Sequence, residues 1–189
     1  MSSSPTAGVS TAKITVTPEQ FTFVHYEAAQ IVDVVTEVGA VLGVANPVHV
    51  IVDETTPAAK LSAEVEGSSS DATITIHVES GALENTQRFT HFGADNARMS
   101  LGRMLLRARD RMRPDFADVP GDLDLSNDEN AAWDVYCAGR LARAGLDVNE
   151  QRWRYNYRNR FGFSDASDAA FDRLWSADDL GWADIVTGG

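Results

Sequence analysis

One stretch of the sequence alternates basic and aromatic side chains, which are the residue types that hold nucleic acids and other anions. The stretch is Arg152–Arg160 and reads RWRYNYRNR. Arginine pairs with phosphate groups, and aromatic rings stack on unpaired bases. The run therefore predicts an anion site or a single-stranded nucleic-acid site. Its candidate binding residues are Arg152, Trp153, Arg154, Tyr155 and Arg158.

The same stretch has two structural interpretations. In a helix, Trp153, Tyr157 and Phe161 form one stripe at a spacing of four residues, which is typical of a buried face. In a strand, the three aromatic residues would share one face and the arginines the other. Asn149 before the run and Gly162 after it are good helix-capping residues, so the helix is favoured and the strand stays open. In the helix, we expect the arginines to pair with the acidic residues that follow.

A second basic set lies in the segment Ala94–Arg113, which reads ADNARMSLGRMLLRARDRMR. Its apolar residues recur with helical spacing, and Arg103, Arg107 and Arg111 form a row along one edge of the apolar stripe. These three arginines are candidate binding residues as well. Long arginine stems can lie along apolar surface, so we expect the row to serve the fold by pairing with acidic segments.

The sequence motifs for metal, calcium, phosphate and nucleophile sites are incomplete or absent. The four histidines are scattered without a second histidine four residues away, and Cys137 is the single cysteine, so we expect no bound metal. The acidic segment that starts at Asp122 begins like a calcium loop. It has Asn127 where such loops need glycine and Trp133 where they need glutamate. No phosphate-binding glycine motif and no nucleophile elbow occurs, so no cofactor is predicted.

The predicted order of strand, helix, three strands and two helices is similar to that of small zinc-dependent peptidases. Their HExxH motif would fall on the helix 94–113. Alignment on Gly102 places Met99 and Arg103 at the histidine positions and Ser100 at the glutamate position. The ligand residues on this helix are therefore absent. The similarity implies at most a peptidase-like scaffold without the metal.

Composition indicates a soluble globular protein. The 189 residues carry a net charge of −12, and 43% of them are hydrophobic. Basic and acidic blocks alternate along the chain: residues 88–113 and 135–160 are basic, and the other three blocks are acidic. The negative charge disfavours nucleic acid and anionic membranes as partners. One cysteine and no long apolar run predict a cytoplasmic protein without a membrane segment.

The N-terminal half should form a small sheet with helices. Residues 1–12 are rich in serine and threonine and are expected to be a disordered tail, followed by a single α+β domain over 13–186. A helix is predicted over 18–43 and strands over 13–17, 47–54, 60–66 and 72–78, the last two joined as a hairpin. Apolar and polar residues alternate in these strands, which predicts a mainly antiparallel sheet with one face covered by helices.

Residues 94–186 should be helical, after a β-rich half at 13–93. Besides 94–113, the pattern predicts a helix from the capping box at Ser126 to near Gly145, and a further helix capped by Ser164 that ends at Trp175. The predicted fold is therefore an α+β class: a small, mainly antiparallel sheet covered by two long helices, followed by a helical C-terminal half.

From these features, the expected function is a cytoplasmic binding or scaffold protein without catalytic activity. Its partner would be a protein or a small molecule. The first alternative is a hydrolase-like enzyme, or a metal-free peptidase-like scaffold, with a site that is not a linear motif. The second alternative is an anion or nucleic-acid binder that uses Arg152–Arg160.

Overall fold

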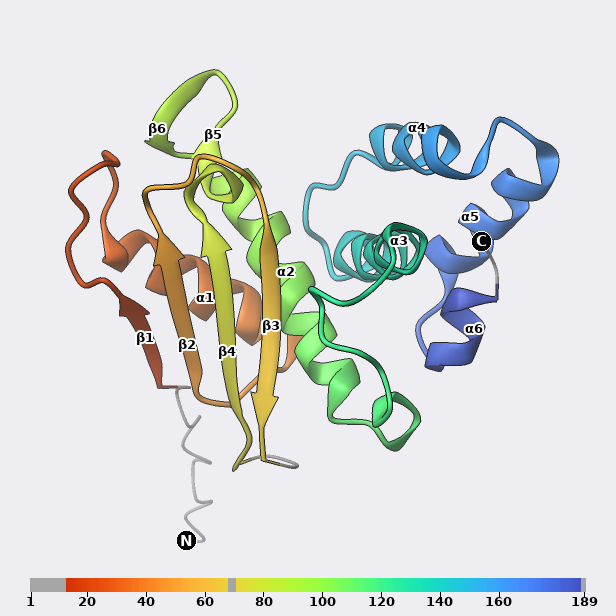
Figure 1. The fold of residues 1–189 in the computed structure, drawn as a ribbon, viewed down its shortest axis with the longest axis horizontal. Helices are drawn as coiled ribbons and strands as arrows, with labels where there is room; N and C mark the ends of the chain where they lie inside the picture. Colours follow the sequence, from red (N-terminus) through yellow and green to blue (C-terminus); the bar gives the residue numbers. More distant parts are fainter. Residues whose placement is uncertain (1–12, 68–70, 188–189) are drawn as a thin grey trace, which may run out of the picture.

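The structure is a computed structural model, and it describes residues 13–67 and 71–187. The predicted tail, residues 1–12, lies outside the described residues. The strands are β1 (Ile14–Thr17), β2 (Val48–Asp53), β3 (Leu61–Glu66), β4 (Thr73–Glu79), β5 (Glu84–Asn85) and β6 (Arg88–Phe92). The helices are α1 (Ala28–Leu42), α2 (Ala94–Arg111), α3 (Asn127–Arg143), α4 (Glu150–Phe161), α5 (Asp165–Ser176) and α6 (Trp182–Val186). The α+β class is confirmed, with α1 and α2 on one face of the sheet and α3–α6 beside it (Figure 1).

The main sheet is mixed, which corrects the prediction of a mainly antiparallel sheet. Its order is β1-β2-β4-β3. The pairs β1–β2 and β2–β4 are parallel, and β3–β4 is the predicted antiparallel hairpin. The helix α1 crosses over between β1 and β2, which makes those strands parallel, and β4 then enters between β2 and β3. Alternation of apolar and polar residues indicates only that one face of the sheet is covered. It does not distinguish parallel from antiparallel neighbouring strands.

The first helix begins at Ala28 rather than at residue 18, so its predicted start was wrong. Residues 18–27 instead run irregularly along the sheet end, where the Glu54 carboxylate accepts the backbone N–H groups of Thr22 and Phe23 at 2.6 Å. Glu27 then caps α1 in a reciprocal capping box with Gln30. Aromatic and β-branched residues dominate 21–26 and lower helix propensity, which explains why spacing alone misled the prediction.

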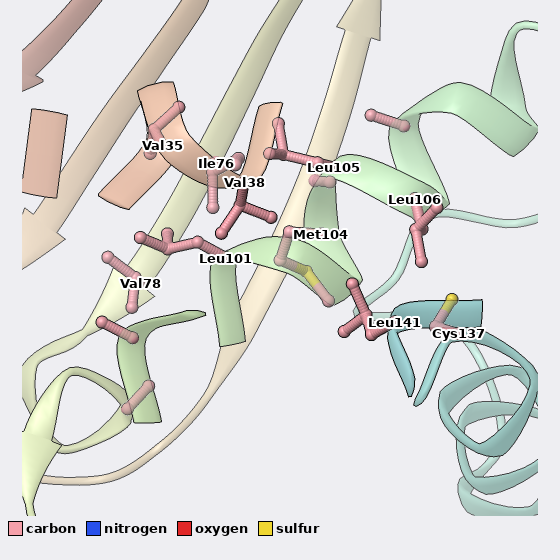
Figure 2. Packing of buried hydrophobic residues seen from close by; sticks show 14 of the residues in the cluster. Val35, Val38, Ile76, Val78, Leu101, Met104, Leu105, Leu106, Cys137 and Leu141 are labelled. Atoms are coloured by element: carbon pink, nitrogen blue, oxygen red, sulfur yellow. The ribbon is translucent and has the colours of Figure 1, made fainter. Parts of the chain in front are cut away.

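The helix α2 lies at the centre of the apolar core. Figure 2 shows its buried residues Leu101 and Leu105 near Val38 of α1, while Met104 faces Leu141 of α3. Gly102 allows this close approach, since an added Cβ would lie 2.9 Å from the Leu141 side chain and 3.2 Å from that of Val38. The helix therefore packs on the sheet layer with one side and on the C-terminal helices with the other.

The helices α3, α4 and α5 begin at their predicted caps. The side chains of Ser126, Asn149 and Ser164 accept backbone N–H groups at the starts of α3, α4 and α5. The segment 150–161 is a helix, which settles the choice between helix and strand. Within the described part of the chain, no helix combines the length and apolar composition needed to cross a membrane.

Candidate functional site

The arginine row of α2 is paired with acids from the segment that follows it. Arg103 contacts the Asp134 carboxylate at 2.5 Å, and Arg107 contacts the same carboxylate at 2.9 Å. Arg111 contacts the Asp122 carboxylate at 2.6 Å, and Arg107 lies 3.4 Å from it. The three guanidinium groups thus connect α2 to the loop before α3 and to α3 itself, as the alternating charge blocks predicted.

Burial makes this network more than a set of surface ion pairs. The side chains of Arg107 and Asp122 are 3% and 1% exposed, and both Arg107 and Arg111 lie over the ring of Trp133. Burial raises the pKa of Asp134, but Arg103 and Arg107 lower it by more, so its pKa lies below the ordinary value. Arg107 is therefore enclosed by the fold, whereas Arg111 is partly buried and Arg103 lines a surface hollow.

The candidate arginines of α4 are divided between ion pairs and solvent. Arg154 contacts Glu150 at 2.9 Å and Asp172 at 2.5 Å, and Arg158 holds Asp168 at 2.6 Å. The pairs with Asp172 and Asp168, which follow the run, were expected for a helix; the pair with Glu150 was not predicted. Arg152 is exposed, and its guanidinium has no ion-pair partner among the described residues.

The aromatic stripe of α4 is buried to different extents. Tyr157 is buried, while Trp153 and Phe161 are half-buried against the core. Trp153 lies under the guanidinium of Arg103, 5.3 Å from the ring centre. Tyr155 is 59% exposed and contacts the ring of Phe163 on the opposite side of the helix. Of the candidate aromatic residues, Trp153 is therefore the one that lies beside Arg103.

A hollow of about 330 Å³ joins some of these residues, between the first half of α2, residues 147–149 and the start of α4. We call it the α2–α4 groove. Its lining residues are Asp95, Asn96, Met99, Ser100, Arg103, Asp147, Val148, Asn149, Arg152, Trp153 and Asn156. The structure thus brings together three of the candidate binding residues, Arg103, Arg152 and Trp153. The others, Arg107, Arg111, Arg154, Tyr155 and Arg158, do not line it.

The chain shows no match to known proteins. No family model, curated protein or solved structure matches it.

Several polar groups of the groove are already used by the fold. The Ser100 hydroxyl donates to the carbonyl of Ala82 at 2.9 Å and is buried, and the Asn96 amide donates to the carbonyl of Glu84 at 2.7 Å. The side chains of Asp147, Arg152 and Asn156 have no hydrogen-bond or ion-pair partner among the described residues. These three side chains are therefore available to a ligand.

Sequence reasoning missed Asn96, Asp147 and Asn156. They come from three separate segments and belong to no motif, so no linear signal could have grouped them. The positions that a peptidase would use for metal ligands, Met99 and Arg103, do line the groove, and Arg103 is held by Asp134 there. Across the residues that the structure describes, no three His, Cys, Asp or Glu side chains are grouped to hold a metal ion.

Other possible reactive groups lie away from the groove. Burial raises the pKa of the Cys137 thiol to about 11, so it is a protonated core residue at neutral pH. His25 and His91 contact each other near the β5–β6 hairpin, with ring centres 5.0 Å apart. A second hollow of about 320 Å³ lies over β3 and β4 and includes His77. Its acids Asp53 and Glu79 accept hydrogen bonds from Thr55 and from the backbone of Lys60.

Proposed function

We propose that this chain is a cytoplasmic binding protein without catalytic activity, and that its ligand occupies the α2–α4 groove. The proposal is based on one hollow that contains a guanidinium and an amide without partners among the described residues, together with a half-buried indole. These belong to Arg152, Asn156 and Trp153. Binding sites typically combine an apolar surface with a few convergent polar groups, which is the composition found here.

The lining of the groove argues against the enzyme alternative. It includes no histidine and no cysteine, and its one hydroxyl, on Ser100, is buried and donated to a backbone carbonyl. An activated nucleophile needs a neighbouring base within hydrogen-bond distance, and Ser100 has no such neighbour among its hydrogen-bond partners. The guanidinium of Arg103 also pairs with Asp134, so this corner of the groove is a fixed ion pair.

The ion pairs of α4 argue against the nucleic-acid alternative. Arg154, Arg158 and Arg160 each contact a carboxylate of this chain at 2.9 Å or less. Phosphate groups would have to displace these carboxylates. Of the arginines in the run, Arg152 is left to bind an anion, which is too little positive charge to follow a nucleic-acid backbone.

The test is a binding screen that also measures turnover. We would add amino acids, short peptides, dicarboxylates, sugar phosphates and nucleotides to ¹⁵N-labelled protein and record its amide and indole signals. The expected result is that at least one class shifts the signals of Met99, Arg152, Trp153 and Asn156. Mass spectrometry of the same mixtures should recover the bound compound unchanged.

Two variants provide the control. Arg152→Gln should weaken the response in the groove, whereas Arg173→Gln, which changes an exposed arginine of α5 outside the groove, should leave it unchanged. If no compound shifts the groove signals at millimolar concentration, the proposal is wrong. If the bound compound is converted, the chain is an enzyme and the proposal is also wrong.

A further inference from the structure

Two of the four histidines meet beside the β5–β6 hairpin, away from the α2–α4 groove. His25 lies in the irregular segment before α1, and His91 lies in β6. The two residues pair directly as an isolated parallel bridge. The backbone N–H of His25 donates to the carbonyl of Thr90 at 2.7 Å. Residues that pair on neighbouring strands project their side chains to the same face, so the bridge places both imidazole rings together.

The separation of the two rings suits two ligands of one metal ion. Their centres are 5.0 Å apart, and the ring planes are inclined by 48°. Zn²⁺ binds histidine nitrogen at about 2.0–2.1 Å and arranges its ligands as a tetrahedron, which places the centres of two bound imidazoles roughly 5 Å apart. The backbone pairing therefore holds His25 and His91 at the spacing that a shared ion requires.

The hydrogen bonds of the rings leave nitrogen lone pairs for such an ion. Nδ1 of His91 lies 3.0 Å from the carbonyl oxygen of Phe89. A carbonyl oxygen only accepts, so Nδ1 donates its proton there, and Nε2 of the neutral ring keeps its lone pair. Metal-binding histidines are commonly oriented by such a contact of the second ring nitrogen. The ring nitrogens of His25 have no hydrogen-bond partner among the described residues.

The backbone next to His91 is held in an uncommon conformation. Thr90 has a φ of 61°, in the left-handed region that β-branched residues rarely adopt. Its N–H donates to the buried carboxylate of Glu84 at 2.7 Å, and its hydroxyl donates to the carbonyl of Phe89 at 2.7 Å. Strained backbone that the surrounding structure maintains is concentrated at functional sites. Here the strained residue directly precedes His91, and its carbonyl accepts the backbone N–H of His25.

The surroundings of the pair suit a cation. His25 is exposed and His91 is partly buried, so an ion can reach both rings from solvent. No third His, Cys, Asp or Glu of the described residues joins the pair, so water would supply the remaining ligands. A hollow of about 530 Å³ beside His25 has no lysine or arginine in its described lining, which consists of Val24, His25, Tyr26, Glu27 and Gln30.

We infer that His25 and His91 together bind one divalent metal ion of the kind that imidazole ligates, which is Zn²⁺, Ni²⁺ or Cu²⁺. The ion would cross-link the segment before α1 to β6. The site is separate from the proposed function, because neither histidine lines the α2–α4 groove. The sequence predicted no bound metal because its histidines lack ligand spacing. His25 and His91 come from separate segments, so spacing along the chain could not connect them.

The experiment titrates Zn²⁺ alone into the full chain, prepared without a histidine tag, and follows the imidazole nitrogen signals of ¹⁵N-labelled protein. Zn²⁺ should shift the signals of His25 and His91 with the same dependence on metal concentration and leave those of His49 and His77 in place. Mg²⁺ prefers oxygen ligands and should shift none of the four. Zn²⁺ should also raise the melting temperature, because it binds the folded chain.

Histidine variants test whether the two rings share one ion. His25→Gln and His91→Gln should each weaken Zn²⁺ binding about tenfold or more in isothermal titration calorimetry, since loss of even an outer-shell partner typically costs 10–100-fold. In His25→Gln, the His91 signal should no longer shift at the Zn²⁺ concentration that saturates the wild type. The matched controls are His49→Gln and His77→Gln, which change histidines of β2 and β4 and should retain the wild-type affinity.

The inference is wrong if millimolar Zn²⁺ leaves the His25 and His91 signals of the wild type unchanged. It is also wrong if the His91 signal of His25→Gln shifts as it does in the wild type, or if His49→Gln weakens binding as much as His25→Gln. Thermal melts without metal show whether a variant is folded, and the wild-type signals decide the question if one is not. None of these results bears on the α2–α4 groove, which is tested by its own signals.

Discussion

Breaking the ion pair between Asp110 and Arg140 should destabilise the protein far more than breaking a surface pair of the same length. Arg140 donates to both carboxylate oxygens of Asp110, at 2.7 and 2.6 Å, and Trp133 donates its indole N–H to the same carboxylate at 2.9 Å. The side chains of Asp110 and Arg140 are 1% and 5% exposed. Arg140→Met therefore leaves a carboxylate that water cannot reach.

The magnitude follows from burial. Removing one partner of a buried pair costs about 3–5 kcal/mol, because the other charge stays uncompensated. For a chain of this size, that cost lowers the melting temperature by about 6–20 °C. The matched control is Arg160→Met, since Arg160 contacts Asp128 at the same 2.6 Å but these side chains are 42% and 63% exposed. An exposed pair contributes about 0–1 kcal/mol.

A double-mutant cycle tests whether the cost comes from the unpaired charge. Asp110→Asn removes the carboxylate but keeps an oxygen for the Trp133 indole. The double variant Asp110→Asn/Arg140→Met should lose less stability than the sum of the single variants, by about 1–3 kcal/mol. Urea denaturation at pH 7 measures all four proteins. The reasoning is refuted if Arg140→Met costs no more than Arg160→Met, or if the two single costs add.

Three further results are expected. Gly139→Ala should lower the free energy of unfolding by about 1–3 kcal/mol in urea denaturation, because the added Cβ would overlap a backbone carbonyl of α5. The control Gly121→Ala should change the free energy of unfolding little, because its Cβ would make an ordinary 3.4 Å contact. The pKa of Asp134 is lowered on folding, so the stability that its carboxylate contributes is present above about pH 4 and is lost as the pH falls through the folded pKa. In Asp134→Asn, the free energy of unfolding should therefore decrease less steeply as the pH is lowered below about 4. Asp122→Ala should cost about 3–5 kcal/mol and speed amide hydrogen exchange at Ala63, whose N–H donates to the Asp122 carboxylate at 2.8 Å. A slower or unchanged exchange rate at Ala63 would contradict that assignment.

The parts of the fold that the sequence predicted are those with local signals. The caps at Ser126, Asn149 and Ser164 are side-chain contacts within three residues, so they can be recognised from spacing alone. Strand direction and the start of α1 depend on contacts between distant segments. Glu54, for example, accepts the backbone N–H groups of residues 22 and 23, more than 30 positions earlier. The helical spacing of apolar residues in 18–27 contains no information about that contact.

The candidate site was predicted in part for the same reason. Arg103, Arg152 and Trp153 were conspicuous as members of arginine-rich and aromatic patterns, and they line the groove. Asp147 and Asn156 were not, because a lone acid in a loop and a lone amide on a helix are common in any sequence. Their place opposite α2 depends on how α4 packs, which is a property of the tertiary fold.

Most arginines of α2 and α4 are paired with acids of this chain, and this distinguishes Arg152 and Asp147 from them. In the row on α2, the arginines are tied to Asp134 and Asp122, and on α4 Arg154 and Arg158 are tied to acids as well. An exposed charge without a partner costs almost nothing by itself, so Arg152 would need no explanation if it lay on an open surface.

The position of Arg152 is different because it lies in a hollow beside a half-buried indole. Asp147 lines the same hollow and also has no partner among the described residues. In a concave site, charges of opposite sign act on a ligand at closer range and with less water between them than on an open surface. A ligand that carries both signs can satisfy both residues at once, whereas an anion or a cation alone would be attracted by one and repelled by the other.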